Sequence, residues 1–332
     1  MNQPVRKPST SRRRRIAIRL ALVAFGLVLA LLAAEVGLRI CMPHELFVPG
    51  SDRKGWTENT ATFDAFMRVD ADLGYIPIPD TQLYDQRGCN RDSEVDKAFA
   101  AEGPSVLWLG DSVTSRRFIE REVRRRCDVP FQSWCGGVEG YNVAQSYGYY
   151  RDVLSRLEPM QVVFTLHHND WLNTPIVFYD DEGKVHCRET DHDVAWFSPW
   201  LFRHCYLYRL LFTWSLQDSG GDEAHATQKV EQALTQLRDE LAAEGRSLWV
   251  LLLPLMKPET EWTNAEQRRH ATAQAVLTRL RVRHVDLLPG LRRALADHVD
   301  PQQLPGDSWH PSEAVAVYLA DELLAAGYVP GK

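Results

Sequence analysis

From residue 105 onward, short apolar runs alternate with longer stretches that have helical periodicity. This alternation is typical of βαβ units, which build a parallel sheet. The runs are continuously apolar, so we expect strands that are buried on both faces. Right-handed crossovers then give a three-layer α/β/α sandwich around a central parallel sheet. The expected strands are 105–110, 129–134, 161–166, 247–255 and 284–288, and the expected helices are 115–126, 142–157, 226–245, 264–281 and 311–327.

The first apolar run ends at Gly110-Asp111-Ser112, and Val113 begins a helix. A serine delivered from a strand end to a helix N-terminus is well placed for nucleophilic catalysis. Ligands bind at the carboxyl ends of parallel strands, and free N–H groups at a helix N-terminus stabilise developing negative charge. An Asp-Ser pair in this position is also an ordinary helix N-cap. Residues at the ends of the other strands are needed to distinguish the catalytic interpretation from the N-cap interpretation.

Three later segments carry polar residues toward the same edge of the sheet. GGVEGYN (136–142) and HHND (167–170) follow expected strands, and GDSWHPSEA (306–314) precedes the last helix. Parallel strands all point the same way, so these segments should converge near Ser112.

Acyl transfer to a serine needs a base, a group that orients the base, and donors for an oxyanion. His310 can act as the base for Ser112. Asp307, three residues earlier, can bond the other ring nitrogen and fix its tautomer. The backbone N–H groups of Ser112 and Gly140 and the side-chain amide of Asn169 are the candidate oxyanion donors. The chain itself supplies every group, so we predict no cofactor.

The set Ser112, Gly140, Asn169 and His310 resembles the SGNH, or GDSL-type, hydrolase superfamily, whose name lists these four residue types. The resemblance runs from about residue 104 to 327. It implies a flavodoxin-like fold in which Ser112 attacks an ester and His310 is the base that Asp307 orients. It also implies that Ser112, Gly140 and Asn169 form the oxyanion hole.

A further resemblance lies upstream. ADLGYIPIPDT (71–81), YDQRGCNRD (84–92) and the apolar span that ends AAEVGLRI look like membrane-anchored bacterial members of this superfamily. Two positions depart from its pattern. His167 stands where a glycine is usual, and Cys135 stands where Asn is frequent. Both bear on the geometry of the oxyanion hole and not on the reaction class. The Gly-x-Ser-x-Gly motif of α/β-hydrolases is absent around Ser112, which argues against that fold.

Several further side chains are expected near the substrate. Tryptophan faces bind sugars but more often serve packing, so two tryptophans here only suggest a carbohydrate. Adjacent strand-end histidines face opposite sides, so we predict no metal site at 167–170. The substrate-proximal candidates are Asp111, His167, Asp170, Trp171 and Trp309.

The N-terminus combines a basic tail with an apolar span. Residues 1–15 hold six basic residues and no acid, and removing them from the net charge of −6 leaves −12 for the rest, which argues against a nucleic-acid partner. Residues 16–40 have about the length that crosses a bilayer, and Glu35 and Arg39 suit its far interface. The positive-inside rule then places the tail in the cytoplasm and everything after residue 40 outside. We therefore predict a single-pass signal-anchor in the plasma (inner) membrane, with a periplasmic catalytic domain. A cleaved signal peptide is the alternative.

The remaining boundaries follow from changes in pattern. Residues 42–104 lack a sustained period and are predicted to be an irregular extension that packs on the domain. Residues 105–328 form the SGNH domain, with an aromatic-rich insertion, 171–225, that is expected to cover the active face. An extracytoplasmic location permits disulfides. Cys187 and Cys205 are candidates for one, and unpaired buried thiols are the alternative.

The sequence thus predicts an extracytoplasmic serine esterase. Its substrate would be an acylated small molecule, glycan or lipid of the cell envelope. An O-acyltransferase of envelope glycans would use the same triad, with a membrane acyl-donor protein as partner. A non-catalytic envelope binding protein on the same fold is the second alternative, and the altered residue His167 favours it.

Overall fold

The computed structural model describes residues 10–41, 59–93, 97, 102–179, 183–189, 197–216 and 223–332. The chain divides into two compact units. The larger unit contains Ser51–Phe178, Lys184–Asp191 and Gly221–Lys332. The smaller unit contains Met1–Gly50, Tyr179–Gly183 and His192–Gly220.

A five-stranded parallel sheet forms the centre of the larger unit, with the strand order β4-β3-β5-β8-β9. β3 lies inside the sheet, where Trp108 is paired with Cys135 of β4 on one side and with Val163 of β5 on the other. All five carboxyl ends therefore lie at one edge. The strands are β3 (Ser105–Gly110), β4 (Gln132–Gly137), β5 (Gln161–Leu166), β8 (Ser247–Leu252) and β9 (Arg283–Asp286).

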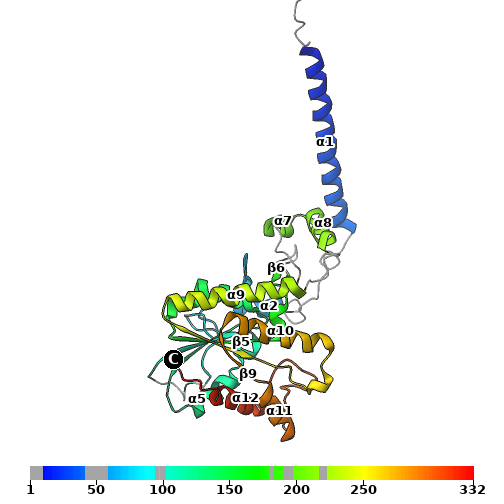
Figure 1. Cartoon of the computed structure of the whole chain (residues 1–332). Helices are drawn as coiled ribbons and strands as arrows, with labels where there is room; N and C mark the ends of the chain where they lie inside the picture. Colours follow the sequence, from blue (N-terminus) through cyan, green and yellow to red (C-terminus); the bar gives the residue numbers. More distant parts are fainter. Residues whose placement is uncertain are drawn as a thin grey trace, which may run out of the picture. The chain divides into compact units, whose positions relative to one another are not determined.

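Helices cover both faces of this sheet (Figure 1). Leu107 and Leu109 of β3 belong to one buried cluster, and Val106 and Trp108 belong to the other, as the alternation along a strand requires. The layers confirm the predicted α/β/α sandwich. The first cluster includes α6 (Val143–Tyr149), α9 (Glu223–Ala243) and α10 (Asn264–Leu280), and the second includes α5 (Phe118–Arg126), α11 (Leu288–Ala296) and α12 (Glu313–Ala325).

Several predicted bounds differ from the structure. The helix expected over 115–126 is two helices, α4 (Ser112–Ser115) and α5, because Arg117 takes a left-handed conformation with φ of 62°. The helix expected over 142–157 ends as α6 at Tyr149 and continues as a π-helical turn (Tyr150–Leu154) and a 3₁₀ turn (Ser155–Leu157). The second strand starts at Gln132 instead of 129.

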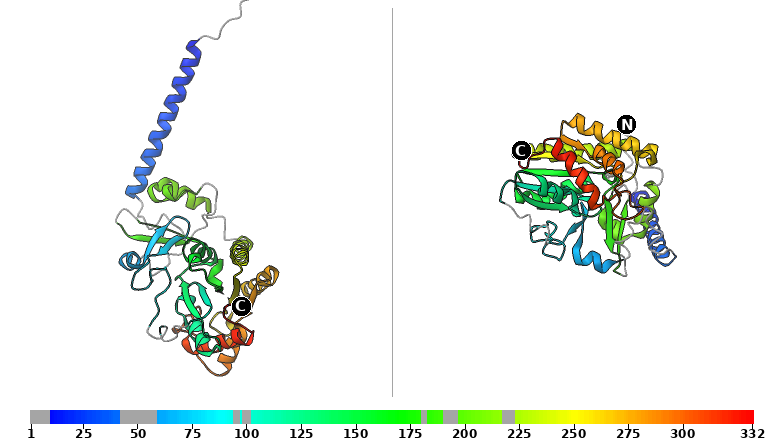
Figure 2. Two further views of the ribbon diagram at one scale, coloured as in Figure 1. Left: turned by 90° about the vertical axis from the view of Figure 1, so that its left-hand side faces the viewer. Right: turned by 90° about the horizontal axis from the view of Figure 1, so that it is seen from below.

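The prediction of an irregular 42–104 segment is wrong for part of its described residues. These include α2 (Thr60–Phe66) and an antiparallel hairpin of β1 (Met67–Asp70) and β2 (Gly74–Pro77). Figure 2 shows this light-blue segment at the edge of the larger unit. Phe63 and Tyr75 are buried and belong to the same cluster as α6. Strands of four residues are too short to show a period, which explains the error.

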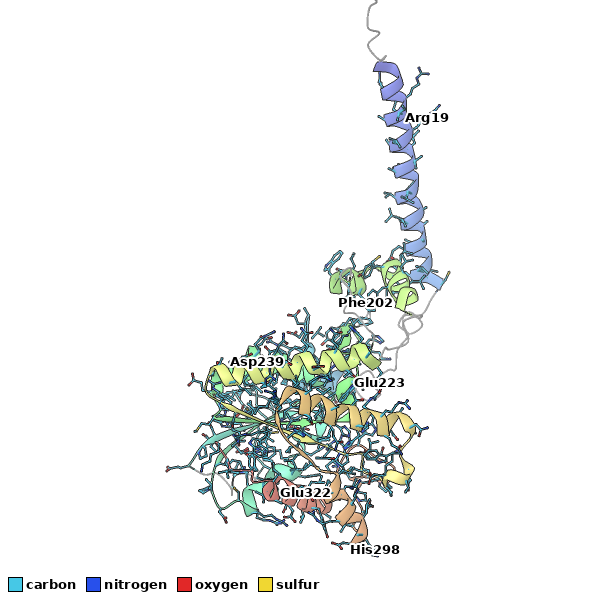
Figure 3. All side chains as sticks on the ribbon, in the orientation of Figure 1. Arg19, Phe202, Glu223, Asp239, His298 and Glu322 are labelled. Carbon is cyan, nitrogen blue, oxygen red and sulfur yellow. The ribbon has the colours of Figure 1, made fainter. Side chains whose placement is uncertain are left out.

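The smaller unit combines a long apolar helix with two short ones, α1 (Thr10–Cys41), α7 (Pro199–His204) and α8 (Tyr206–Leu216). α1 is long and apolar enough to cross a membrane, judged by length and composition. The Glu35 carboxylate accepts the N–H groups of Tyr206 and Leu207, at 3.0 and 2.8 Å, and so caps the N-terminus of α8. Figure 3 marks Phe202 of α7 and Arg19 of α1.

The aromatic insertion is therefore shared between the two units. The hairpin strands β6 (Pro175–Tyr179) and β7 (Val185–Glu189) belong mostly to the larger unit, whereas α7 and α8 belong to the smaller one. That the insertion covers the active face stays a prediction. Cys187 and Cys205 are both free thiols in the structure.

Candidate active site

Three predicted residues form a hydrogen-bonded array in the larger unit. Ser112 Oγ lies 2.7 Å from His310 Nε2, and His310 Nδ1 lies 2.7 Å from Asp307 Oδ2. Both nitrogens of the imidazole thus have a partner. An Asp-bonded Nδ1–H leaves Nε2 as an acceptor for the serine hydroxyl, which is the arrangement of a serine nucleophile and its base.

The local sequence fixes Ser112 at the end of β3. Gly110 has a φ of 149°, and a Cβ there would lie 2.5 Å from Thr114 Oγ1, so the turn requires glycine. Asp111 follows as the N-cap of α4, and its Oδ1 accepts the N–H of Val113 at 2.9 Å. The N-cap interpretation is therefore confirmed for Asp111, while Ser112 Oγ faces His310 and its catalytic role stays a prediction.

The loop that carries His310 is held from the β8 side of the sheet. The N–H of Met256, just beyond β8, donates to the carbonyl of Ser308 at 2.8 Å, and Gln302 Nε2 donates to the Met256 carbonyl at 3.1 Å. Ser312 then caps α12 through Val315 N–H. These bonds fix the histidine by backbone contacts on both sides of it.

Hydrogen bonds also fix the carboxyl group of Asp307. Its Oδ1 accepts the N–H groups of Trp309 and His310. Partial burial acts to raise the pKa of Asp307, but these hydrogen bonds and the His310 ring outweigh it and hold the pKa below its usual value. Asp307 is therefore ionised at neutral pH.

Asn169 is connected to the serine turn by a hydrogen bond to Asp111. Its Nδ2 donates to Asp111 Oδ2 at 2.5 Å, and its other contact, to the Tyr141 carbonyl, is 3.5 Å long. Gly140 lies in the loop between β4 and α6 with a φ of 76°. Val138 of this loop donates its N–H to the Gly110 carbonyl at 3.0 Å. The structure thus brings both donor loops to the end of β3.

Two buried carboxyl groups lie behind the serine. Burial raises the pKa of Asp111, although the bonds from Val113 and Asn169 act in the opposite direction. Burial and the neighbouring Asp111 raise the pKa of Asp170 far above its ordinary value. Asp170 Oδ2 accepts the N–H of His167 at 2.6 Å. Asp170 is therefore buried and holds the loop in place.

The two histidines of this loop contact different neighbours. The His167 ring lies 5.4 Å from Trp309, centroid to centroid, whereas the His168 ring stacks on His270 at 6.5 Å. No group of three or more His, Cys, Asp or Glu side chains among the described residues is placed to bind a metal ion.

The two tryptophans that were predicted to lie near the substrate, Trp171 and Trp309, differ in solvent exposure. Trp171 is buried, and its indole N–H donates to Thr227 of α9 at 3.0 Å, so it serves packing. Trp309 is 40% exposed and lies next to His310 in the sequence. Only Trp309 is therefore available to a substrate.

A cavity of about 270 Å³, which was not predicted from the sequence, lies beside the serine turn. Residues from the N-terminal segment, among them Phe66 and Leu83, line it together with Ser115 and Arg116. No motif marks it, because its walls come from three separate parts of the chain.

No known family model matches the chain, and no curated protein matches its sequence. Several solved structures are similar to it. LAE5, an alpha/beta hydrolase enzyme from the metagenome of Lake Arreo, Spain, is 17% identical, with 69% of this chain and 96% of that chain covered and a TM-score of 0.46. Axe2, an acetylxylan esterase from Geobacillus stearothermophilus, is 14% identical with the same coverage and a TM-score of 0.45. The acetyl xylan esterase AlAXEase is 13% identical, with 68% and 100% covered and a TM-score of 0.43. At such values, what these proteins act on does not identify the substrate of this chain.

The buried histidines predict how stability depends on pH. Burial, together with nearby positive charge, lowers the pKa of His168 to about 4, and burial lowers the pKa of His167 well below its usual value. Between pH 6.5 and 4 the unfolded chain therefore binds more protons at these two histidines than the folded chain does, so their contribution to the free energy of unfolding falls as the pH falls. His168→Phe should reduce this decline by up to about 1.4 kcal/mol per pH unit in urea unfolding.

His298→Asn is the matched control, because His298 is exposed near the end of α11 (Figure 3) and asparagine tolerates its φ of 58°. It should leave the decline unchanged. An equal decline in His168→Phe and in the unsubstituted protein would contradict the prediction.

Proposed function

We propose that this protein is a serine ester hydrolase of the SGNH type, with Ser112 as nucleophile. The observation that carries the proposal is the array Asp307–His310–Ser112 at the carboxyl end of β3. Ser112 Oγ attacks the ester carbonyl while His310 Nε2 takes the hydroxyl proton. Asp307 stabilises the imidazolium that forms.

His310 then donates that proton to the alkoxy oxygen, and the alcohol leaves an acyl-serine. In the second half, His310 takes a proton from water and the hydroxide attacks the acyl carbonyl. Ser112 leaves with the proton returned by His310, and the carboxylic acid is released. If a sugar hydroxyl replaces the water, the same groups catalyse O-acyl transfer.

The oxyanion would be stabilised by the N–H groups of Ser112 and Gly140 and by the amide of Asn169. Asp111 Oδ2 accepts one of the two amide protons of Asn169 and so fixes the orientation of this amide. The other proton has only the 3.5 Å contact with Tyr141, which is at the outer limit for a hydrogen bond and can be exchanged for an oxyanion. Asp111 is therefore a positioning residue for Asn169.

The alcohol part of the substrate is proposed to be a carbohydrate or another envelope molecule. Trp309 supports this assignment, because it is 40% exposed and directly precedes His310, the proposed proton donor to the leaving alcohol, in the sequence. An exposed indole face suits a sugar ring.

The nucleophile can be tested with a fluorophosphonate probe on the whole protein. The unsubstituted protein should be labelled and should hydrolyse p-nitrophenyl esters, whereas Ser112→Ala should do neither. Ser155→Ala, which removes a hydroxyl from the 3₁₀ turn after α6, should keep both properties. Losses in His310→Ala and Asp307→Ala should be non-additive with each other. Labelling of Ser112→Ala equal to that of the unsubstituted protein would refute the proposal.

The oxyanion assignment makes a separate prediction for Asn169. Asn169→Ala should lower kcat about 10²- to 10³-fold, the usual loss for one donor, and leave KM nearly unchanged. kcat should fall much more than KM changes, because the donor stabilises the transition state and not the bound ester. A loss of less than about tenfold, measured with the same p-nitrophenyl ester, would show that Asn169 is not a donor.

We also propose that α1 anchors the protein in the plasma membrane with the catalytic unit outside. The basic residues at its N-terminal end support this orientation. Glu35 and Arg39 support it at the other end, where polar groups meet water or headgroups. Glu35 accepts N–H groups at the start of α8, and Arg39 donates to the carbonyl of His204 at the end of α7.

The whole protein, expressed in a bacterium with two membranes, should stay in the membrane fraction after salt and carbonate washes and dissolve in detergent. Protease added to spheroplasts should degrade the catalytic unit without lysis. A soluble periplasmic product with a shortened N-terminus would instead establish the cleaved signal peptide. Degradation only after lysis would show that the catalytic unit lies in the cytoplasm and would contradict the proposed orientation.

A further inference from the structure

The cavity beside the serine turn has two kinds of wall. Residues from the N-terminal segment supply its apolar side chains, Phe66, Met67, Leu83 and Tyr84. The active-site loops supply Ser115, Arg116 and Glu139. Leu83 is 48% exposed, so its side chain is accessible to a ligand in the cavity.

Hydrogen bonds connect these walls directly to the catalytic groups. Ser115 Oγ donates to the Ser112 carbonyl at 2.9 Å. Glu139 precedes the proposed oxyanion donor Gly140, and its carbonyl accepts the Tyr75 hydroxyl at 2.6 Å. The Arg116 and Glu139 side chains approach to 3.6 Å, so an ion pair joins the two loops at the cavity's polar edge. The cavity thus begins within one residue of the oxyanion donor.

The direction of proton transfer decides which part of an ester enters this cavity. His310 donates its proton to the leaving oxygen, so the alcohol must lie on the side of its loop, which Met256 holds near β8. The cavity lies on the opposite side of β3, where Ser115 and Glu139 border β4. The acyl substituent extends away from the leaving alcohol and therefore points toward the cavity.

We infer that this cavity binds the acyl chain, and that the substrate is an ester of a medium-length aliphatic acid and not an acetyl ester. The inference rests on the proposed esterase function. An acetyl methyl group would leave the exposed parts of the apolar walls in contact with water, whereas several methylenes would cover Phe66 and Leu83. Ser115, Arg116 and Glu139 lie toward the catalytic turn, so the chain passes from a polar entrance to an apolar interior.

The experiment compares p-nitrophenyl acetate, butyrate, hexanoate and octanoate with the whole protein. kcat/KM should rise about fourfold with each added methylene until the cavity is filled. Leu83→Trp, which adds volume at the cavity, should lower kcat/KM for hexanoate and octanoate at least tenfold and change that for acetate less than twofold. Phe66→Ala, which enlarges the cavity, should move the optimum to a longer chain.

Met160→Trp is the matched control, because Met160 is 52% exposed and precedes β5 at the other end of the sheet. It should leave the chain-length profile unchanged. Acetate turnover also reports whether each variant is folded. A profile that does not rise with chain length, or an equal loss for all esters in Leu83→Trp, would overturn the inference while labelling of Ser112 upheld the esterase. If neither ester turnover nor labelling occurs, the esterase proposal fails and the inference fails with it.

Discussion

The carboxyl group of Asp111 holds the ends of the two central strands together. One of its oxygens accepts the N–H of Val113, which fixes the turn after β3, and the other accepts the amide of Asn169, which follows β5. The group is 3% exposed, and a buried carboxyl without partners would be costly. The serine turn and the Asn169 loop are therefore mutually dependent, because a shift in either would leave this carboxyl unsatisfied.

The same constraint explains how groups far apart in the sequence work as one site. Ser112 and His310 are separated by 198 positions, yet their side chains are 2.7 Å apart. The sheet brings the first to the edge as a strand end, while backbone bonds to Met256 hold the loop of the second. Folding thus already places these groups in the arrangement that the proposed reaction needs, and in this sense the candidate site is preorganised.

The sequence predicted elements best where the hydrophobic pattern is local and is long enough to identify a strand or a helix. The bounds of β3 and β5 agree with the predicted runs, because both strands are buried on both faces and continuously apolar. α11 was missed, since it is short and contains Pro289 and Gly290. Gly290 permits close packing against the Tyr318 carbonyl, which a Cβ would approach to 2.7 Å. Such a contact depends on a partner far along the chain. Local propensity therefore predicts that the glycine interrupts a helix.

The two departures from the superfamily pattern show why site residues were easier to predict than their surroundings. Cys135 stands where an asparagine is frequent, and the amide of Asn90 lies 3.6 Å from its sulfur and donates to the Gly137 carbonyl at 2.6 Å. An amide is thus present at this place, but the N-terminal segment supplies it. His167 stands where a glycine is usual, and its ring packs on Trp309 in the loop that carries His310. Each departure is matched by a contact with an element outside its own motif, so neither contact could be predicted from one motif alone. The roles proposed for Ser112, Asp307 and His310 follow from chemistry that needs those residue types, whereas the groups that support them can come from any part of the chain that the fold brings near.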